Sequence, residues 1–163
     1  MSRLTTLVTP TRLFAAAVVL PLAAVGAALV SQHVFDMQPC PWCVLQRAIF
    51  VAIALAALPG LLLRSALVRR ISAAVFGLLA ASGVAAALWQ HFVAASSTSC
   101  NLTLADRIMS GLGLDSLAPE VFAAYASCAD AAVDLLGLPY EFYSLVLYVL
   151  LLAAAVLLLR RPV

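Results

Sequence analysis

The sequence predicts an all-α membrane protein, a four-transmembrane-helix bundle that forms a single domain over residues 1–163. Three observations predict it: an apolar composition, four apolar runs long enough to cross a bilayer, and separate placement of arginines and acids. The chain is 66% hydrophobic and 10% charged, with a mean hydropathy of +1.13. A soluble domain carries about 25% charged residues. The composition therefore excludes a disordered chain and argues strongly against a water-soluble globule.

The apolar runs cover approximately residues 13–30, 44–63, 71–93 and 143–159. A cleaved secretory signal is an alternative for the first run, because Arg3 and Arg12 precede an alanine-rich stretch. The apolar core of a signal is usually about 7–15 residues long, whereas this run has 18 residues before Ser31. Its length favours an uncleaved span.

The charges predict the orientation. Basic residues next to spans stay on the cytoplasmic side, which places both termini and the loop 64–70 in the cytoplasm. Loops 31–43 and 94–142 then lie on the outer side, where all seven acids also fall. Seven of the nine arginines define the inner side: Arg3, Arg12, Arg64, Arg69, Arg70, Arg160 and Arg161.

Two sets of residues suit the ends and the interior of such a bundle. Aromatic rings with a polar edge prefer the membrane boundary, and five lie there: Trp42, Trp89, Tyr140, Phe142 and Tyr143. Small residues allow helices to approach closely, and four lie within the spans: Gly26, Gly77, Ser82 and Gly83.

The loop 94–142 has 49 residues, too many for a simple connection. Ser116 is a candidate N-cap for a short helix that Pro119 joins near its first turn. One face of that helix is apolar: Leu117, Val121 and Ala124. We expect a segment that lies on the outer membrane surface, or alternatively a small plug packed on the bundle.

All four cysteines, Cys40, Cys43, Cys100 and Cys128, fall on the predicted outer side. An even number on the oxidising face of a membrane predicts two disulfides, with three possible pairings. Cys40 and Cys43 form a Cys-Pro-Trp-Cys unit too short for a long-range staple, which leaves Cys100 and Cys128 as the natural second pair. Zinc is disfavoured because a second Cys-x₂-Cys unit is missing. Two static structural disulfides remain an alternative.

The Cys-Pro-Trp-Cys unit has the features of a reactive thiol pair. Pro41 suits the first position of a helix, so Cys43 meets the positive end of a helix dipole. Arg47 lies one turn further, at i+4 on the same face. Both effects favour the thiolate, which is the reactive species. The alternative for Arg47 is that its side chain snorkels to lipid headgroups.

Two histidines lie on the outer side. His91 lies at the outer end of the third span, at the predicted depth of the thiols. It is either a packing residue or a residue that hydrogen-bonds to a ligand or protonates it. His33 is expected to be an ordinary surface residue.

Three segments resemble the DsbB family of disulfide bond formation proteins. Gln38-Pro-Cys-Pro-Trp-Cys-Val-Leu-Gln-Arg47 is similar to the family signature. The segments 115–128 and 134–140 resemble its second-loop motif and the start of its last span. The resemblance implies an inner-membrane protein-disulfide oxidoreductase (thiol:quinone). Such an enzyme reoxidises a periplasmic DsbA-like thiol oxidase and passes electrons to a quinone, ubiquinone or menaquinone. Neither nucleic acid nor metal is implied.

The resemblance also implies roles for the cysteines. The thiolate of the partner protein would attack Cys100 to form a mixed disulfide, and Cys128 would be the loop partner of Cys100. Cys40 and Cys43 would form the membrane-proximal disulfide that reoxidises the loop pair.

The quinone-binding residues implied by the resemblance are Cys43, which would face the quinone, Arg47 beside a quinone oxygen, and His91 lining the site. Gln46 stands where some members have an acid, so no proton role is expected there.

Two other functions compete. A vitamin K epoxide reductase-like enzyme also combines four membrane helices with Cys-x-x-Cys, but its redox motif follows the loop cysteines, whereas here it precedes them. The alternative that is not an enzyme is a structural or partner-binding membrane protein with two static loop disulfides.

Overall fold

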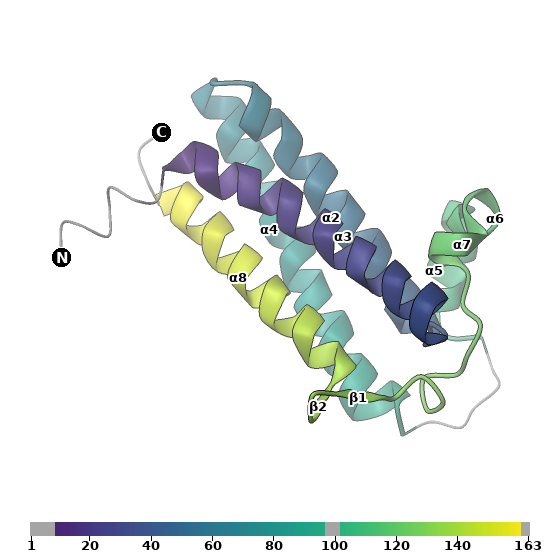
Figure 1. The fold of residues 1–163 in the computed structure, drawn as a ribbon. Coiled ribbons are helices and arrows are strands. Elements are labelled where there is room, and N and C mark those ends of the chain that lie inside the picture. The colour runs from purple at the N-terminus through teal and green to yellow at the C-terminus, as the bar shows by residue number, and fades with distance from the viewer. Residues whose placement is uncertain (1–8, 97–101, 161–163) are drawn as a thin grey trace.

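The computed structural model describes residues 9–96 and 102–160. Four of its helices are long and apolar enough to cross a membrane, which confirms the predicted fold class. Figure 1 shows them as the long rods of the molecule. They are α2 (Pro10–Phe35), α3 (Pro41–Leu62), α4 (Ala66–Trp89), which continues as the π-helical turn η1 (Gln90–Ala94), and α8 (Tyr140–Arg160).

The helices extend beyond the apolar runs of the sequence. The shortest, α8, has 21 residues, which at 1.5 Å per residue spans about 31 Å and matches the hydrocarbon core of a bilayer. The predicted runs were shorter because hydropathy detects only the apolar centre of a helix. Backbone hydrogen bonding continues into the polar residues at both ends.

The turn between α2 and α3 fixes where the Cys-Pro-Trp-Cys unit begins. Helix α2 ends at Asp36, whose φ of 52° lies in the left-handed region and turns the chain away. Helix α3 begins at Pro41 with Cys40 as its N-cap, as the sequence predicted for the proline. Cys40 and Cys43 therefore lie within the first turn of a helix.

Aromatic side chains fill the centre of the bundle. The rings of Phe50 and Tyr148 stack at 4.2 Å, and Phe14 meets Phe76 edge-on at 6.0 Å. Gly83 of α4 makes room for Tyr148, because a Cβ at this position would overlap the tyrosine ring. Gly26, also predicted to serve helix packing, has no neighbour at its Cβ position. That part of the prediction is wrong.

The outward faces of the helices are apolar. Leu55, Leu78 and Val149 are 64%, 73% and 50% exposed. Such an apolar surface is costly in water and suits a lipid environment. The fold thus buries small and aromatic residues inside and presents aliphatic residues to the bilayer.

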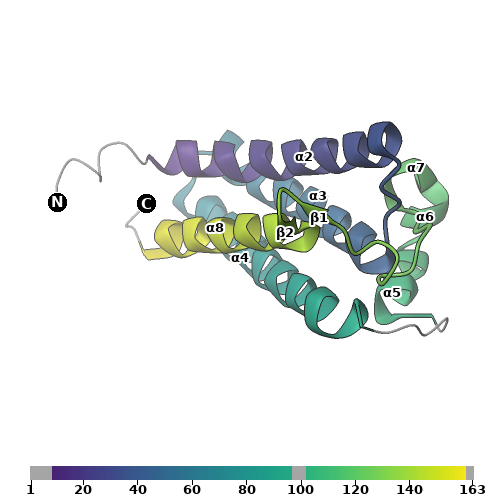
Figure 2. The same cartoon turned by 60° about the horizontal axis from the view of Figure 1, so that its bottom comes forward.

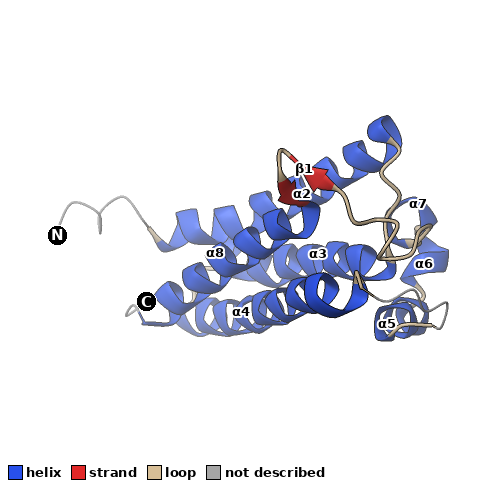
Figure 3. Cartoon of the chain, turned by 90° about the horizontal axis from the view of Figure 1, so that it is seen from below, coloured by secondary structure: helices blue, strands red, loops and turns tan. Residues whose placement is uncertain are grey.

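One end of the bundle carries the short elements, and we call it the loop end. It holds α5 (Leu104–Leu112), α6 (Leu114–Leu117), α7 (Pro119–Phe122) and the hairpin of β1 (Asp134–Leu135) and β2 (Leu138–Pro139). Figure 2 shows α5, α6 and α7 gathered there, and Figure 3 shows the hairpin, in red, before α8. The first residues of α2 and the last of α8 lie at the opposite end (Figure 1).

The loop helices differ from the prediction. Ser116 lies inside α6 rather than capping a helix, and Ala118 separates α6 from α7 with φ −142°. The longest loop helix is α5, where Thr103 and Asp106 form a reciprocal capping box. Ala105 and Met109 of α5 belong to the buried cluster at the start of α3. In the predicted surface segment, Val121 packs partly against the bundle core and Leu117 is 79% exposed, so the choice between a surface segment and a plug stays open.

Replacing Gly83 with alanine tests the close contact between α4 and α8. We expect Gly83→Ala to lower the free energy of unfolding by about 1–3 kcal/mol, because the added methyl overpacks the Tyr148 ring. Thermal unfolding in detergent measures this. Gly26→Ala is the control, and because its Cβ position is open, its midpoint should stay unchanged or rise slightly. Equal effects of the two substitutions would contradict the packing described.

Candidate active site

The first turn of α3 holds two of the four cysteines. Cys40 is fully buried, and its Sγ accepts the backbone N–H of Cys43 at 3.2 Å, so the sulfur itself caps the helix. Cys43 is half-buried inside the first turn. Free backbone N–H groups and the helix dipole both stabilise negative charge there. This part of the site has the geometry that the sequence predicted.

The second loop brings Cys128 to Cys40. The backbone N–H groups of Tyr125 and Ala126 donate to the Pro39 carbonyl at 2.9 and 3.2 Å, which ties the loop to the residue before Cys40. Cys128 is 8% exposed, and a hydrogen bond links its sulfur to that of Cys40. Cys100, the fourth cysteine, lies outside the described residues.

This hydrogen bond separates the acidities of the two thiols. The hydrogen bond with Cys40 lowers the pKa of Cys128, whereas the same bond, the interaction with Cys43 and burial raise the pKa of Cys40. The contact therefore favours negative charge on Cys128 over negative charge on Cys40.

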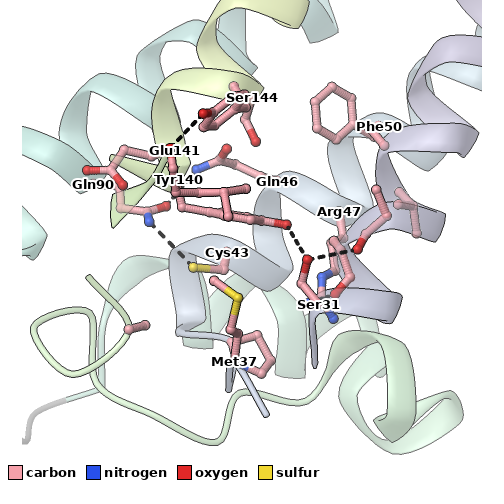
Figure 4. A pocket seen from close by; sticks show the side chains of 18 of the residues that line it. Ser31, Met37, Cys43, Gln46, Arg47, Phe50, Gln90, Tyr140, Glu141 and Ser144 are labelled. Carbon is pink, nitrogen blue, oxygen red and sulfur yellow. Dashed lines mark hydrogen bonds between the residues drawn. The ribbon is translucent and has the colours of Figure 1, made fainter. Parts of the chain in front are cut away.

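Cys43 opens on an internal cavity of about 250 Å³, shown in Figure 4. It is lined by residues of α2, α3 and α8, by Gln90 of η1, by residues 37–39 of the turn before α3, and by Ala131 and Leu135 of the second loop. Ala24, Val25, Phe50 and Leu147 supply apolar walls. The polar lining consists of Ser31, Gln38, Gln46, Arg47, Gln90, Tyr140, Glu141, Tyr143 and Ser144.

A chain of two amides reaches the Cys43 sulfur. Gln46 Nε2 donates to Gln90 Oε1 at 2.6 Å, which turns the other end of the Gln90 amide to donate to Cys43 Sγ at 3.4 Å. Gln90 is the first residue of the π-helical turn η1, a feature often found at functional sites. Sequence reasoning missed Gln90. The only signal was its position beside Trp89 and His91 at the end of a span.

Arg47 lines the cavity one turn after Cys43, on the predicted face. Its guanidinium donates to Gln32 Oε1 at 2.7 Å and to the carbonyls of Val121 and Ala28 at 3.1 and 3.4 Å. Arg47 is 6% exposed. The structure thus contradicts the snorkelling alternative, and the charge is held inside the protein.

His91 lies behind the cavity wall rather than among the lining residues. Its Nδ1 is 2.7 Å from Oε1 of Glu141, which does line the cavity. Phe92 and Phe142 meet the imidazole edge-on. His33 is half-exposed and lies 3.9 Å from the exposed Glu120. Within residues 9–96 and 102–160, no group of three His, Cys, Asp or Glu residues is arranged to hold a metal ion.

The fold and site define a class of protein. A four-helix membrane bundle that aligns Cys128, Cys40 and Cys43 toward an internal cavity has the construction of a membrane-embedded disulfide oxidoreductase. The family model described as "Disulfide bond formation protein DsbB" matches residues 10–158. The chain belongs to the DsbB family, whose members act in disulfide bond formation, and is a multi-pass protein of the bacterial inner membrane.

Curated relatives agree with the family model. The chain is 32% identical over 160 residues to disulfide bond formation protein B 1 of Pseudomonas aeruginosa, covering 95% of this chain and 98% of the relative. It is 30% identical over 145 residues to disulfide bond formation protein B of Cupriavidus metallidurans, covering 88% and 89%. The corresponding protein of Herminiimonas arsenicoxydans is 32% identical over 131 residues, covering 80% and 82%.

Removing the amide that faces Cys43 tests its role at this sulfur. In a variant that keeps Cys43 as its only cysteine, we expect Gln90→Leu to slow alkylation by a membrane-permeant maleimide about threefold to tenfold, because the thiolate loses a donor. Ser82→Ala is the control, since the exposed Ser82 hydroxyl bonds to the Leu79 carbonyl and Ser82 does not line this cavity. An unchanged rate for Gln90→Leu would show that the amide does not activate the thiol.

Proposed function

We propose that the protein oxidises a DsbA-like dithiol protein in the periplasm and passes the electrons to a membrane quinone. The observation that carries this proposal is the order of the sulfurs. Cys128 contacts Cys40, Cys40 caps the turn that contains Cys43, and Cys43 lines the cavity. In this proposal the loop end faces the periplasm, as the arginine distribution predicts.

The thiol steps follow from the acidities and positions of the sulfurs. The partner's thiolate attacks Cys100 of the Cys100–Cys128 disulfide and releases Cys128 as a thiolate. Cys128 then attacks Cys40 of the Cys40–Cys43 disulfide. A Cys128–Cys40 bond forms, the Cys40–Cys43 bond breaks, and the electron pair leaves on Cys43. Two electrons move inward at each exchange.

The surroundings of Cys43 make it a good leaving group. The helix N-terminus, the Gln90 amide and the buried Arg47 all stabilise a negative charge on its sulfur. A thiolate of low basicity leaves faster in disulfide exchange. The same groups surround the sulfur of Cys43 where it meets the cavity.

The cavity residues fit a quinone headgroup. An apolar cavity of about 150 Å³ already holds benzene, so the 250 Å³ found here accommodates a substituted ring. The alanines, Val25 and Phe50 suit the faces of such a ring, and Arg47 is a donor suited to a quinone oxygen. When bound, a quinone would supply an acceptor for two electrons and two protons.

An electron sink is required on energetic grounds. For a two-electron couple, 30 mV corresponds to about 1.4 kcal/mol, so a strongly oxidising partner is recharged only by an acceptor of higher potential. Quinones are lipid-soluble, and a cavity among membrane helices is where such an acceptor is reached. This requirement supports the quinone rather than a second soluble disulfide as the final acceptor.

Removing the innermost sulfur tests the proposal. We expect purified Cys43→Ala to reduce no quinone when supplied with a reduced thioredoxin-like partner, while its thermal unfolding midpoint stays close to that of the wild type. Quinone absorbance gives the first measurement and detergent melting curves give the second. Ser82→Ala, which removes an exposed hydroxyl of α4, should reduce quinone normally.

Normal quinone reduction by Cys43→Ala would overturn the assignment. The static-disulfide alternative is separated from it by the redox state of the cysteines in quinone-depleted membranes. A relay that has lost its acceptor accumulates thiols, whereas structural staples stay oxidised.

A further inference from the structure

A buried carboxyl group faces the cavity that holds Cys43. Glu141, in the first turn of α8, is 7% exposed, and among the described residues that line the cavity it is the only carboxylic acid. An acid is costly to bury unless it is paired or keeps its proton. Its partner here is His91, with Oε1 and Nδ1 separated by 2.7 Å. Figure 4 shows Glu141 near Gln90 and Ser144 on the cavity wall.

His91 connects this acid to the surface of the protein. Its side chain is 33% exposed, compared with 8% for Glu141. The rings of Phe92 and Phe142 meet the imidazole edge-on and hold it beside the acid. An imidazole exchanges protons near neutral pH. The pair therefore forms a two-residue path with one end in the cavity and the other accessible from outside.

The other titratable groups around the cavity serve this purpose poorly. The Arg47 guanidinium does not release its proton in proteins, and Cys43 is the electron donor of the proposed reaction. The hydroxyl groups of Tyr140 and Tyr143 already donate their protons in hydrogen bonds to Ser31 Oγ and the Leu135 carbonyl. Of these groups, Glu141 is the one that both lines the cavity and contacts a partly exposed imidazole.

We propose that Glu141 is a catalytic residue that delivers protons to the occupant of the cavity, and that His91 reloads it from the surface. This inference rests on the proposed quinone reaction. When the Cys43 thiolate and the Cys40 thiol form their disulfide, they give up two electrons and one proton, that of Cys40, so a second proton has to come from another group. Conversion of a quinone to a quinol consumes two protons. A single carboxyl releases one proton at a time, so it must be reprotonated before it can deliver another.

The matched pair Glu141→Gln and Glu120→Gln tests the inference on the full-length protein in detergent. Glutamine keeps the size of Glu141 but carries no transferable proton, whereas Glu120 lies on α7 with a side chain that is 77% exposed. With a short-chain quinone in a single turnover, we expect Glu141→Gln to be about 10²-fold slower than wild type and Glu120→Gln to be unchanged. Equilibrium binding of that quinone should be the same in all three proteins.

Two further measurements separate proton transfer from a structural role. The infrared difference spectrum between oxidised and reduced protein, recorded with quinone bound, should contain a carboxyl band that shifts in deuterium oxide. This band should be absent from Glu141→Gln and present in Glu120→Gln. His91→Ala should be slow and should regain rate on addition of imidazole, as expected when a surface proton carrier is replaced. Imidazole should not restore the rate of the double variant that carries both His91→Ala and Glu141→Gln.

Each outcome supports or overturns one claim. If Glu141→Gln binds quinone normally and reacts at the wild-type rate, or if it is slow only because it no longer binds quinone, the inference is wrong. If Glu141→Gln does not fold, His91→Ala decides, and absence of imidazole rescue overturns the inference. If the wild-type protein itself reduces no quinone, the proposed function fails instead.

Discussion

The site depends on the Cys40 sulfur at the N-cap of α3. This one atom accepts the backbone N–H of Cys43 at 3.2 Å and hydrogen-bonds to Cys128 from the second loop. It is fully buried, so neither contact competes with water. Side chains with an oxygen usually occupy an N-cap. Here a sulfur at the N-cap connects the first turn of a membrane helix to a cysteine of the second loop.

The loop is held in place by hydrogen bonds that also belong to the membrane site. The Arg47 guanidinium lines the cavity and donates to the Val121 carbonyl of α7, while Pro39 accepts two N–H groups from the segment before Cys128. Buried donors of this kind are costly to leave unpaired. The position of the loop and the shape of the cavity are therefore not independent, since a movement of Arg47 affects both.

Local features of this site were predictable and long-range contacts were not. Helical periodicity and the fixed φ of proline placed Pro41, Cys43 and Arg47 correctly on α3, because these relations span four residues. The contacts of Gln46 with Gln90 and of Arg47 with Val121 join positions separated by 44 and 74 residues. No local pattern encodes such contacts. The prediction of one helix capped by Ser116 failed because Gly113 and Ala118 interrupt the helical backbone on either side.

The most direct test of the account is the fate of electrons when Cys40 is replaced by alanine. With excess reduced thioredoxin-like partner and quinone in stopped flow, the Cys40→Ala protein should oxidise one equivalent of partner through its loop disulfide and then stop, with no quinone reduced. This follows because the Cys128 thiolate no longer has a sulfur to attack. Continued turnover with quinone reduction would show that electrons reach Cys43 by another route and would contradict the account.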